Sequence, residues 1–225
     1  MTYDLYIGDR TFSSWSLRGW LMMQKFDIPH RTHLVGLYSG TMADDLAKVA
    51  PARLVPVMRT PQGTVVGEST AMAETLAEAH PDRGMWPAGA AARATARWLC
   101  AEMASGFSAL RGECPMQLQH VNQGFQTTDA IRTDLARIET LWAHAAQFKT
   151  DGPWLLGDYS LADCFYAPVC ARIIGYDLPV SDSARAYCMT TISDPAFKAW
   201  RAEGLKVTYD PFPYDMGVKT TDWPA

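Results

Sequence analysis

The stretch His80–Gly89 divides the chain into two parts with different sequence patterns. Before it, short apolar runs typical of strands alternate with segments of helical spacing, in the order strand-helix-strand-helix-strand-strand-helix. After it, every long segment has helical spacing. The stretch itself is rich in proline and glycine, which interrupt regular structure and mark boundaries between domains. We therefore predict an α/β domain over residues 1–80, a linker over 81–89 and an all-helical domain over 90–225.

Within these domains the apolar spacing predicts individual elements. The run Tyr3–Ile7 alternates apolar and polar residues and predicts a half-buried strand, with Tyr3, Leu5 and Ile7 on one face. Further strands are predicted over 33–37, 55–58 and 64–66, and helices over 14–25, 42–49 and 69–79. In the second domain, helices are predicted over 90–110, 129–148 and 161–174, then a short one from Pro195 and an extended tail from Asp210.

The composition excludes several classes of function. The 225 residues carry a formal net charge of -4, so the chain lacks the basic surface typical of nucleic-acid binding. No run approaches the roughly 20 apolar residues that cross a bilayer. Charged residues at positions 4, 9 and 10 interrupt any secretion-signal pattern. We expect a cytoplasmic protein with neither a nucleic-acid nor a membrane partner.

The cysteines and histidines indicate neither disulfides nor a metal. The cysteine count is odd and no C-x-x-C pair occurs, so we expect free thiols buried in helices. The histidines lack the spacing of metal ligands, and no metal site is predicted. The cysteines are Cys100, Cys114, Cys164, Cys170 and Cys188.

Three serines lie at the start of the first predicted helix, in the segment Phe12-Ser13-Ser14-Trp15-Ser16-Leu17-Arg18. A hydroxyl at this position has two possible roles. It caps the free N–H groups of the helix, or it donates a hydrogen bond to an anion bound there. Both roles are open from this segment alone.

A proline interrupts the predicted strand over 55–58. Pro56 lacks a backbone donor, which is compatible with an edge strand. Alternatively, a cis bond before Pro56 turns the Val55 backbone outward, where its N–H and C=O pair with a peptide-like ligand.

Two polar residues, Glu68 and Ser69, stand where the third predicted helix begins. Ser69 is either a helix cap or, together with the free N–H groups there, a site for a carboxylate. Glu68 either complements the helix dipole or pairs with an ammonium group. By contrast, Ser160 and Asp163 form a capping-box pattern, for which we predict only a structural role.

These motifs, in this order, resemble the glutathione transferase family. The features that carry the resemblance are the serine cluster, the Val55-Pro56 pair, Glu68-Ser69 and the capping box of residues 160–163, and it covers almost the whole chain. It implies a thioredoxin-like N-terminal domain followed by the all-helical domain. The serine cluster is closest to the zeta-like pattern S-S-C-x-x-R, with Ser13, Ser14 and Arg18 on matching positions. Trp15 stands where that pattern has cysteine.

The resemblance implies that residues 1–80 bind glutathione as co-substrate. Ser13 is our first choice, and Ser14 the second, for the hydroxyl that stabilises the thiolate. The remaining binding residues implied are Val55, Pro56, Glu68 and Ser69. Leu54 occupies a position that is often polar in relatives, so we expect either that Arg53 or Lys48 replaces that contact or that the contact is weaker.

The resemblance further implies an acceptor site for small hydrophobic electrophiles between the domains, a homodimer and a role in detoxification. Candidate acceptor residues are Phe12, Trp15, Met103, Phe107 and Leu110; the alternative is that they belong to the inter-domain core. Alternative activities are a maleylacetoacetate-type isomerase, which the departure at Trp15 disfavours, and a non-catalytic binding module. A thioredoxin-type oxidoreductase is excluded, because it needs a cysteine where this chain has serines.

Overall fold

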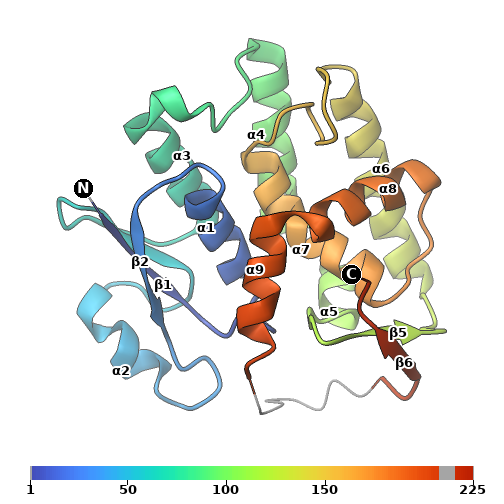
Figure 1. The fold of residues 1–225 in the computed structure, drawn as a ribbon, viewed down its shortest axis with the longest axis horizontal. Helices are drawn as coiled ribbons and strands as arrows, with labels where there is room; N and C mark the ends of the chain where they lie inside the picture. The colour runs from blue at the N-terminus through green and yellow to red at the C-terminus, as the bar shows by residue number, and fades with distance from the viewer. Residues whose placement is uncertain (1, 208–215, 225) are drawn as a thin grey trace.

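The computed structural model describes residues 2–207 and 216–224. It has a sheet domain at the N-terminus and a larger domain of helices after it (Figure 1). This confirms the predicted fold class. A short 3-10 turn, Pro81–Arg83, lies where the linker was predicted.

The N-terminal domain is built on a four-stranded mixed sheet in the order β2-β1-β3-β4. The central strand β1 runs parallel to β2 and antiparallel to β3, which pairs with β4. The strands are β1 Tyr3–Ile7, β2 His30–Leu34, β3 Val57–Arg59 and β4 Val65–Val66.

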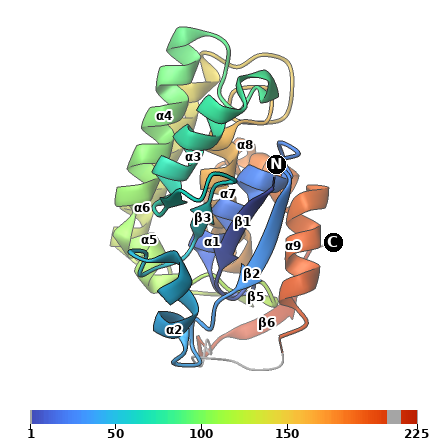
Figure 2. The same ribbon diagram turned by 90° about the vertical axis from the view of Figure 1, so that its left-hand side faces the viewer.

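Helices cover both faces of this sheet (Figure 2). Tyr3, Leu5 and Ile7 share one hydrophobic cluster with residues of α1 and α3. Tyr6 points to the other face and belongs to a second cluster that includes Leu46 of α2. All five β1 residues are therefore buried, whereas a half-buried strand was predicted. The helices are α1 Ser14–Gln24, α2 Met42–Leu46, the 3-10 helix η1 Ala47–Val49 and α3 Ser69–Ala79.

The second strand lies three residues before its predicted position. It begins at His30, directly after Pro29, and its register pairs Tyr3 with His30 and Ile7 with Leu34. Because β2 is an edge strand, several of its side chains face solvent; Leu34 is 64% exposed. The apolar run used for the prediction therefore extends beyond the strand into the following loop.

In the part of the second domain that the structure describes there are six α-helices, and α7 packs against α4 and α8. The predicted helix over 90–110 is interrupted at Gly106 and Phe107, where Phe107 takes a left-handed φ of 56° and a new helix begins. α8 was not predicted. The helices are α4 Ala90–Ser105, α5 Ser108–Glu113, α6 Asp129–Ala146, α7 Leu161–Gly175, α8 Asp182–Ser193 and α9 Pro195–Gly204.

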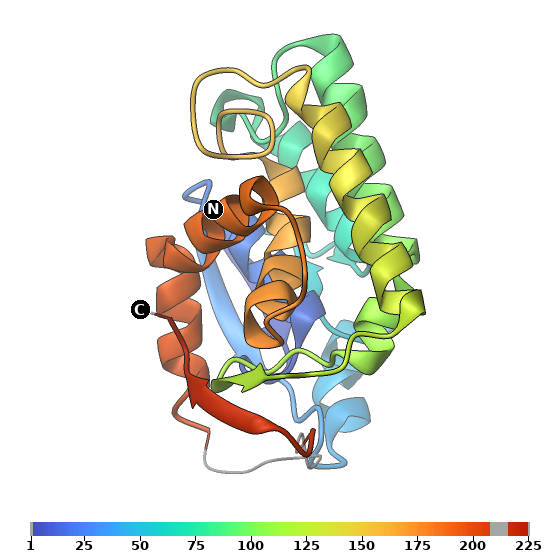
Figure 3. The ribbon, with the colours of Figure 1, turned by 90° about the vertical axis from the view of Figure 1, so that its right-hand side faces the viewer.

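This domain was predicted to be all-helical, but it also contains a two-stranded antiparallel sheet at one end (Figure 3). Strand β5, His120–Gln123, pairs with β6, Lys219–Asp222. The extended tail predicted from Asp210 lies partly outside the described residues. Its described part is this strand and the buried Trp223, which packs against Gly175 of α7.

Helix α7 forms the centre of the core, since all of its residues are buried. It begins with the predicted capping box of Ser160 and Asp163. The five cysteines are free and buried, as predicted. Within residues 2–207 and 216–224, no helix is long and apolar enough to span a bilayer, and no cluster of three or more acidic, histidine or cysteine side chains has the geometry of a metal site.

Helix α1 packs so closely on the loop before β3 that a side chain added at Gly19 would be crowded. A Cβ added at Gly19 would lie 2.8 Å from Pro56 Cβ and 2.9 Å from Pro56 Cγ. We expect Gly19→Ala to lower the free energy of unfolding in urea by about 1 kcal/mol or more, because overpacking outweighs the gain in helix propensity. Gly112→Ala in α5 is the control, since no atom lies within 4 Å of its added Cβ. Equal stability of the two variants would contradict this expectation.

Candidate active site

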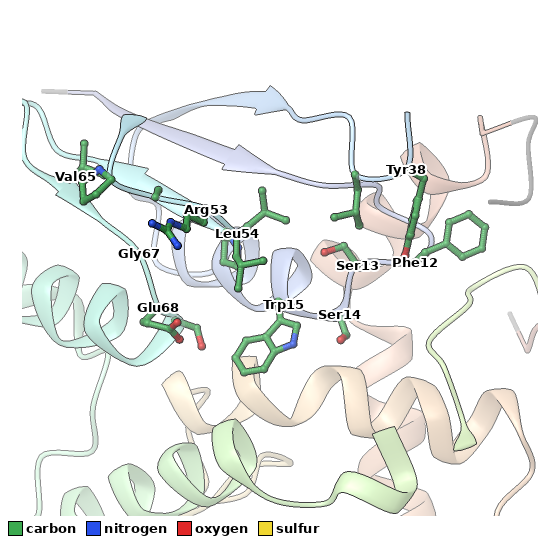
Figure 4. Close-up of a pocket in the computed structure, with 16 residues that line it drawn as sticks. Phe12, Ser13, Ser14, Trp15, Tyr38, Arg53, Leu54, Val65, Gly67 and Glu68 are labelled. Carbon is green, nitrogen blue, oxygen red and sulfur yellow. The ribbon is translucent and has the colours of Figure 1, made fainter. Parts of the chain in front are cut away.

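A cavity of about 660 Å³ opens along the N-terminal domain, at the carboxyl end of β1 (Figure 4). It is formed by the loop into α1, the loop after β2, the segment before β3 and the turn into α3. The structure thus brings together three of the four predicted motifs. Its lining residues are Phe12, Ser13, Ser14, Trp15, Leu37, Tyr38, Pro51, Ala52, Arg53, Leu54, Val55, Pro56, Val65, Gly67, Glu68 and Ser69.

Ser13 is the N-cap of α1. Its hydroxyl oxygen accepts a hydrogen bond from the backbone N–H of Ser16 at 3.3 Å, and its hydroxyl donates to Ser16 Oγ at 2.8 Å. Ser16 Oγ in turn accepts from the Gly8 N–H at 2.9 Å. Ser13 is 7% exposed. Its hydroxyl proton is therefore used inside the protein, and its oxygen caps the helix, which is one of the two roles that the sequence left open.

Ser14 is half-buried and lies on the cavity wall. Its hydroxyl has no hydrogen-bond partner among the residues that the structure describes. The same is true of the backbone N–H groups of Ser14 and Trp15, which are the first two of α1. In Figure 4 the Ser14 and Trp15 side chains both point toward the helices of the second domain. A free hydroxyl and two free N–H groups at a helix N-terminus favour an anion beside Ser14.

Trp15 is held by two guanidinium groups. The centre of the Arg18 guanidinium lies 4.2 Å from the centre of the indole, and that of Arg111 lies 5.1 Å from it. Arg111 comes from α5 and donates to the Gly106 carbonyl at 3.1 Å, so Trp15 links the two domains. Arg18 is buried, and its pKa is lowered to about 9, chiefly by burial and then by the charges of Arg172 and Arg111.

The peptide bond between Val55 and Pro56 is cis, the geometry that the functional interpretation required. Val55 precedes β3 and is outside the ladder, which begins at Val57. Within the described part of the chain, neither the N–H nor the C=O of Val55 has a hydrogen-bond partner. Both groups are therefore available to a ligand with a peptide-like backbone.

Glu68 and Ser69 form the opposite end of the cavity. Glu68 is exposed and has a positive φ of 54°, which is uncommon for a residue with a side chain. Ser69 is 1% exposed, and its Oγ has no hydrogen-bond partner among the residues described. It opens α3, an 11-residue helix whose first three N–H groups also lack partners in the described ranges. A buried free hydroxyl beside free N–H groups is suited to a carboxylate.

The two cations proposed to replace the contact at Leu54 lie in different places. Arg53 lines the cavity and makes no ion pair with any residue described. Lys48 is not on the cavity wall; its Nζ lies over the ring of Tyr6, 5.6 Å from the ring centre, on the α2 side of the sheet. The geometry therefore favours Arg53 over Lys48.

Of the five candidate acceptor residues, two line the cavity and three do not. Phe12 and Trp15 line the cavity, and Phe12 packs edge-on against Tyr38. Met103, Phe107 and Leu110 do not line it; they are buried in the hydrophobic cluster that both domains share. These three residues therefore have the position of the inter-domain core alternative, while the acceptor role stays a prediction.

Sequence reasoning missed Leu37 and Tyr38 on the cavity wall. Residues 33–37 were assigned to a strand, so the loop that follows β2 was not considered as a source of ligand contacts. The signal available was the aromatic Tyr38 directly after the apolar run.

Comparison with known proteins gives three kinds of similarity. Residues 12–79 match the family model for the glutathione S-transferase N-terminal domain. A probable maleylacetoacetate isomerase from Caenorhabditis elegans is 28% identical over 200 residues, covering 87% of this chain and 91% of the relative. Maleylacetoacetate isomerase from Dictyostelium discoideum is 31% identical over 94 residues, or 41% of this chain and 42% of that protein.

Solved structures share the whole fold. A Burkholderia glutathione transferase homologue with bound glutathione superposes with a TM-score of 0.68 at 23% identity, covering 92% of this chain and 100% of that one. A sphingomonad glutathione S-transferase complexed with glutathione gives 0.66 at 18% identity, covering 91% and 100%. Residues 12–79 thus match the glutathione S-transferase N-terminal domain family, and the chain as a whole has the fold of the glutathione transferases.

Proposed function

We propose that the protein binds glutathione in this cavity and transfers its thiolate to a small electrophile. The observation that carries the proposal is the set of free polar groups along one cavity: the Ser14 hydroxyl, the Val55 backbone and the Ser69 hydroxyl. In order, these suit a thiolate, a peptide backbone and an α-carboxylate. Glu68 suits an ammonium group, and Arg53 suits a second carboxylate. Glutathione has all five groups.

The chemistry requires only that the thiol be ionised. A free thiol has a pKa of about 8.5, and lowering it by two units needs about 2.7 kcal/mol. A hydrogen bond from the Ser14 hydroxyl to the thiolate contributes about 1.5–3 kcal/mol, and the N-terminus of α1 about 0.3–1 kcal/mol. The thiol proton leaves to solvent. The sulfur lone pair then forms the new C–S bond while the leaving group departs with the electrons of the bond that breaks.

The acceptor lies beside Phe12 and Trp15 in this proposal. The experiment is isothermal titration with glutathione combined with a conjugation assay on 1-chloro-2,4-dinitrobenzene. Binding with conjugation supports the transferase. Binding without conjugation of this or other halides indicates the non-catalytic module, and no binding contradicts the proposal.

Replacing the buried hydroxyl at the start of α3 tests the carboxylate site. We expect Ser69→Ala to raise the Kd for glutathione roughly tenfold, because a hydrogen bond to a charged group is worth about 1.5 kcal/mol or more. Thr70→Ala is the matched control on the next residue, which does not line the cavity. The titration with glutathione measures both. An unchanged Kd for Ser69→Ala would remove Ser69 from the site.

An isomerase is the second candidate, favoured by the names of the C. elegans and D. discoideum relatives. Such an enzyme uses the thiolate transiently and returns it, with no leaving group. We expect little turnover of a cis-diketo acid by the natural chain, and an increase in Trp15→Cys, which restores the zeta-like pattern. Turnover of this substrate above that of the aromatic halide would make isomerisation the main activity.

The family resemblance also supports a homodimer, a cytoplasmic location and a role in detoxification. The first of these has a direct test. Sedimentation equilibrium is expected to give twice the mass of the 24.9 kDa chain. A monomer at micromolar concentration would contradict it.

A further inference from the structure

The segment that carries Ser13 and Ser14 is anchored by a helix almost two hundred residues later in the chain. Thr11 is fully buried, and its hydroxyl donates to the carbonyl of Gly204, the last residue of α9, at 2.6 Å. The indole N–H of Trp200, also in α9, donates to the carbonyl of Arg10 at 2.7 Å. Two consecutive residues of the loop are thus bonded to one helix.

The contact leaves little freedom for the loop. A Cβ added at Gly204 would lie 2.9 Å from Thr11 Oγ1 and 3.2 Å from the Thr11 nitrogen, so the helix end and the loop backbone touch. Trp200 is fully buried and packs against Trp20 of α1, with 5.4 Å between ring centres. Figure 1 shows α9 beside the sheet domain, where it packs against α1 and α8.

Two further hydrogen bonds of the loop are local. The Thr11 N–H donates to Asp9 Oδ1 at 3.0 Å, and the Ser13 N–H donates to the Asp9 carbonyl at 2.8 Å. These bonds fix the shape of the turn, but they do not fix its place relative to the second domain. Only the bonds from α9 do that among the contacts that the structure describes for residues 10 and 11.

We propose that Thr11 and Trp200 are positioning residues, through which α9 sets the place of the Ser14 hydroxyl and hence the pKa of the bound thiol. This inference rests on the proposed function. A hydrogen bond to a thiolate depends steeply on distance and angle, so a small shift of the loop weakens it. The ligand's backbone and carboxylate contacts, which come from Val55 and Ser69, do not pass through this loop. Displacing the loop is therefore expected to raise the thiol pKa while leaving glutathione affinity nearly unchanged.

The test compares Thr11→Val with Thr191→Val. Thr191 is also buried, and its hydroxyl also donates to a backbone carbonyl, that of Tyr187 at 3.0 Å, but in α8 and away from the cavity. The two variants therefore lose the same kind of bond. Thr11→Ser restores the hydroxyl and is expected to restore the natural behaviour. Gly204→Ala keeps the Thr11 hydroxyl but crowds the loop, so this variant displaces the loop in a second way if Thr11→Val folds poorly.

The first readout needs no ligand. Hydrogen exchange of the amides in residues 10–17 is expected to speed up in Thr11→Val and Gly204→Ala, and to stay unchanged in Thr191→Val and Thr11→Ser. Unchanged exchange in both of the first two variants would overturn the anchoring role. This holds even if the natural protein fails to bind glutathione, an outcome that contradicts the proposed function alone.

The second readout is the pKa of bound glutathione, followed by thiolate absorbance, together with the pH profile of kcat. We expect a rise of about one pKa unit in Thr11→Val, and therefore about a fivefold lower kcat at pH 6.5 that recovers at high pH. KM for glutathione is expected to change less than threefold. Faster exchange with an unchanged thiol pKa, or a loss of kcat that persists at high pH, would overturn the positioning role.

Discussion

Ser14→Ala is expected to lower kcat for conjugation about 25-fold at pH 7 and to change KM for glutathione by less than threefold. The reason is that the Ser14 hydroxyl is the free donor beside the first N–H groups of α1, whereas that of Ser13 is bonded to Ser16. Its loss removes about two pKa units of thiolate stabilisation, at 1.36 kcal/mol per unit. The measurement is the pH dependence of kcat and of thiolate absorbance in the complex with glutathione. At a pH above both thiol pKa values, the variant and the natural protein should converge.

Ser13→Ala is the matched control on the neighbouring residue. Because Ser13 caps α1, this variant is expected to lower the free energy of unfolding by about 1–2 kcal/mol with a smaller effect on the thiol pKa. The reverse pattern, in which Ser13→Ala raises the thiol pKa and Ser14→Ala does not, would assign the thiolate to Ser13. That was our first choice from the sequence.

The sequence predicts correctly those elements whose conformation is set by residues within or next to them. The bounds of α3 follow from Gly67 and Ser69 before it and from Pro81 after it, and the structure has the helix over the predicted residues. The cis geometry before Pro56 was one of two alternatives for a proline in a strand pattern. In these cases the residue type restricts the backbone directly, so the sequence carries the information.

Elements that depend on distant partners were missed. β5 consists of only His120–Gln123, and its partner β6 lies about a hundred residues later, so neither segment has a strong pattern of its own. Phe107 lies inside a segment with helical spacing, and nothing in that spacing indicates its left-handed φ of 56°. Met103 and Leu110 were candidates only because of the family resemblance, and the structure buries both in the core.

The choice between Ser13 and Ser14 shows how far the site residues can be predicted from the sequence. Adjacent serines at a helix start are equivalent in a sequence pattern, and the difference lies in one hydrogen bond, from Ser13 to Ser16 Oγ. Tyr38 was missed for the opposite reason. It has no motif, and reaches the cavity only because β2 ends at Leu34 and the chain turns there.

Asp163→Ala is expected to lower the free energy of unfolding by about 3–5 kcal/mol. The carboxylate is fully buried and accepts from the N–H groups of Leu155 and Ser160 at 3.1 and 2.8 Å. It also accepts from the hydroxyls of Ser160 and Tyr187. Removing it leaves four buried donors without an acceptor, the kind of loss that produces the largest effects of single substitutions. Urea unfolding at pH 7 measures the effect. Asp158→Ala, an exposed carboxylate in the same segment, is expected to change stability by less than 1 kcal/mol.

The pH dependence separates the charge of Asp163 from its hydrogen bonds. Burial raises the pKa of this carboxyl from its ordinary value of 3.8 to about 6. Between about pH 4 and pH 6, the folded protein therefore holds a proton that the unfolded chain has released. The stability from this group is present below pH 4 and is lost as the pH rises through 6. Asp163→Asn does not titrate, so its deficit in unfolding free energy relative to the natural protein should be larger at pH 4.5 than at pH 7. With Asp158→Asn as the non-buried reference, a deficit that stays constant or grows with pH would show that Asp163 is ionised throughout this range.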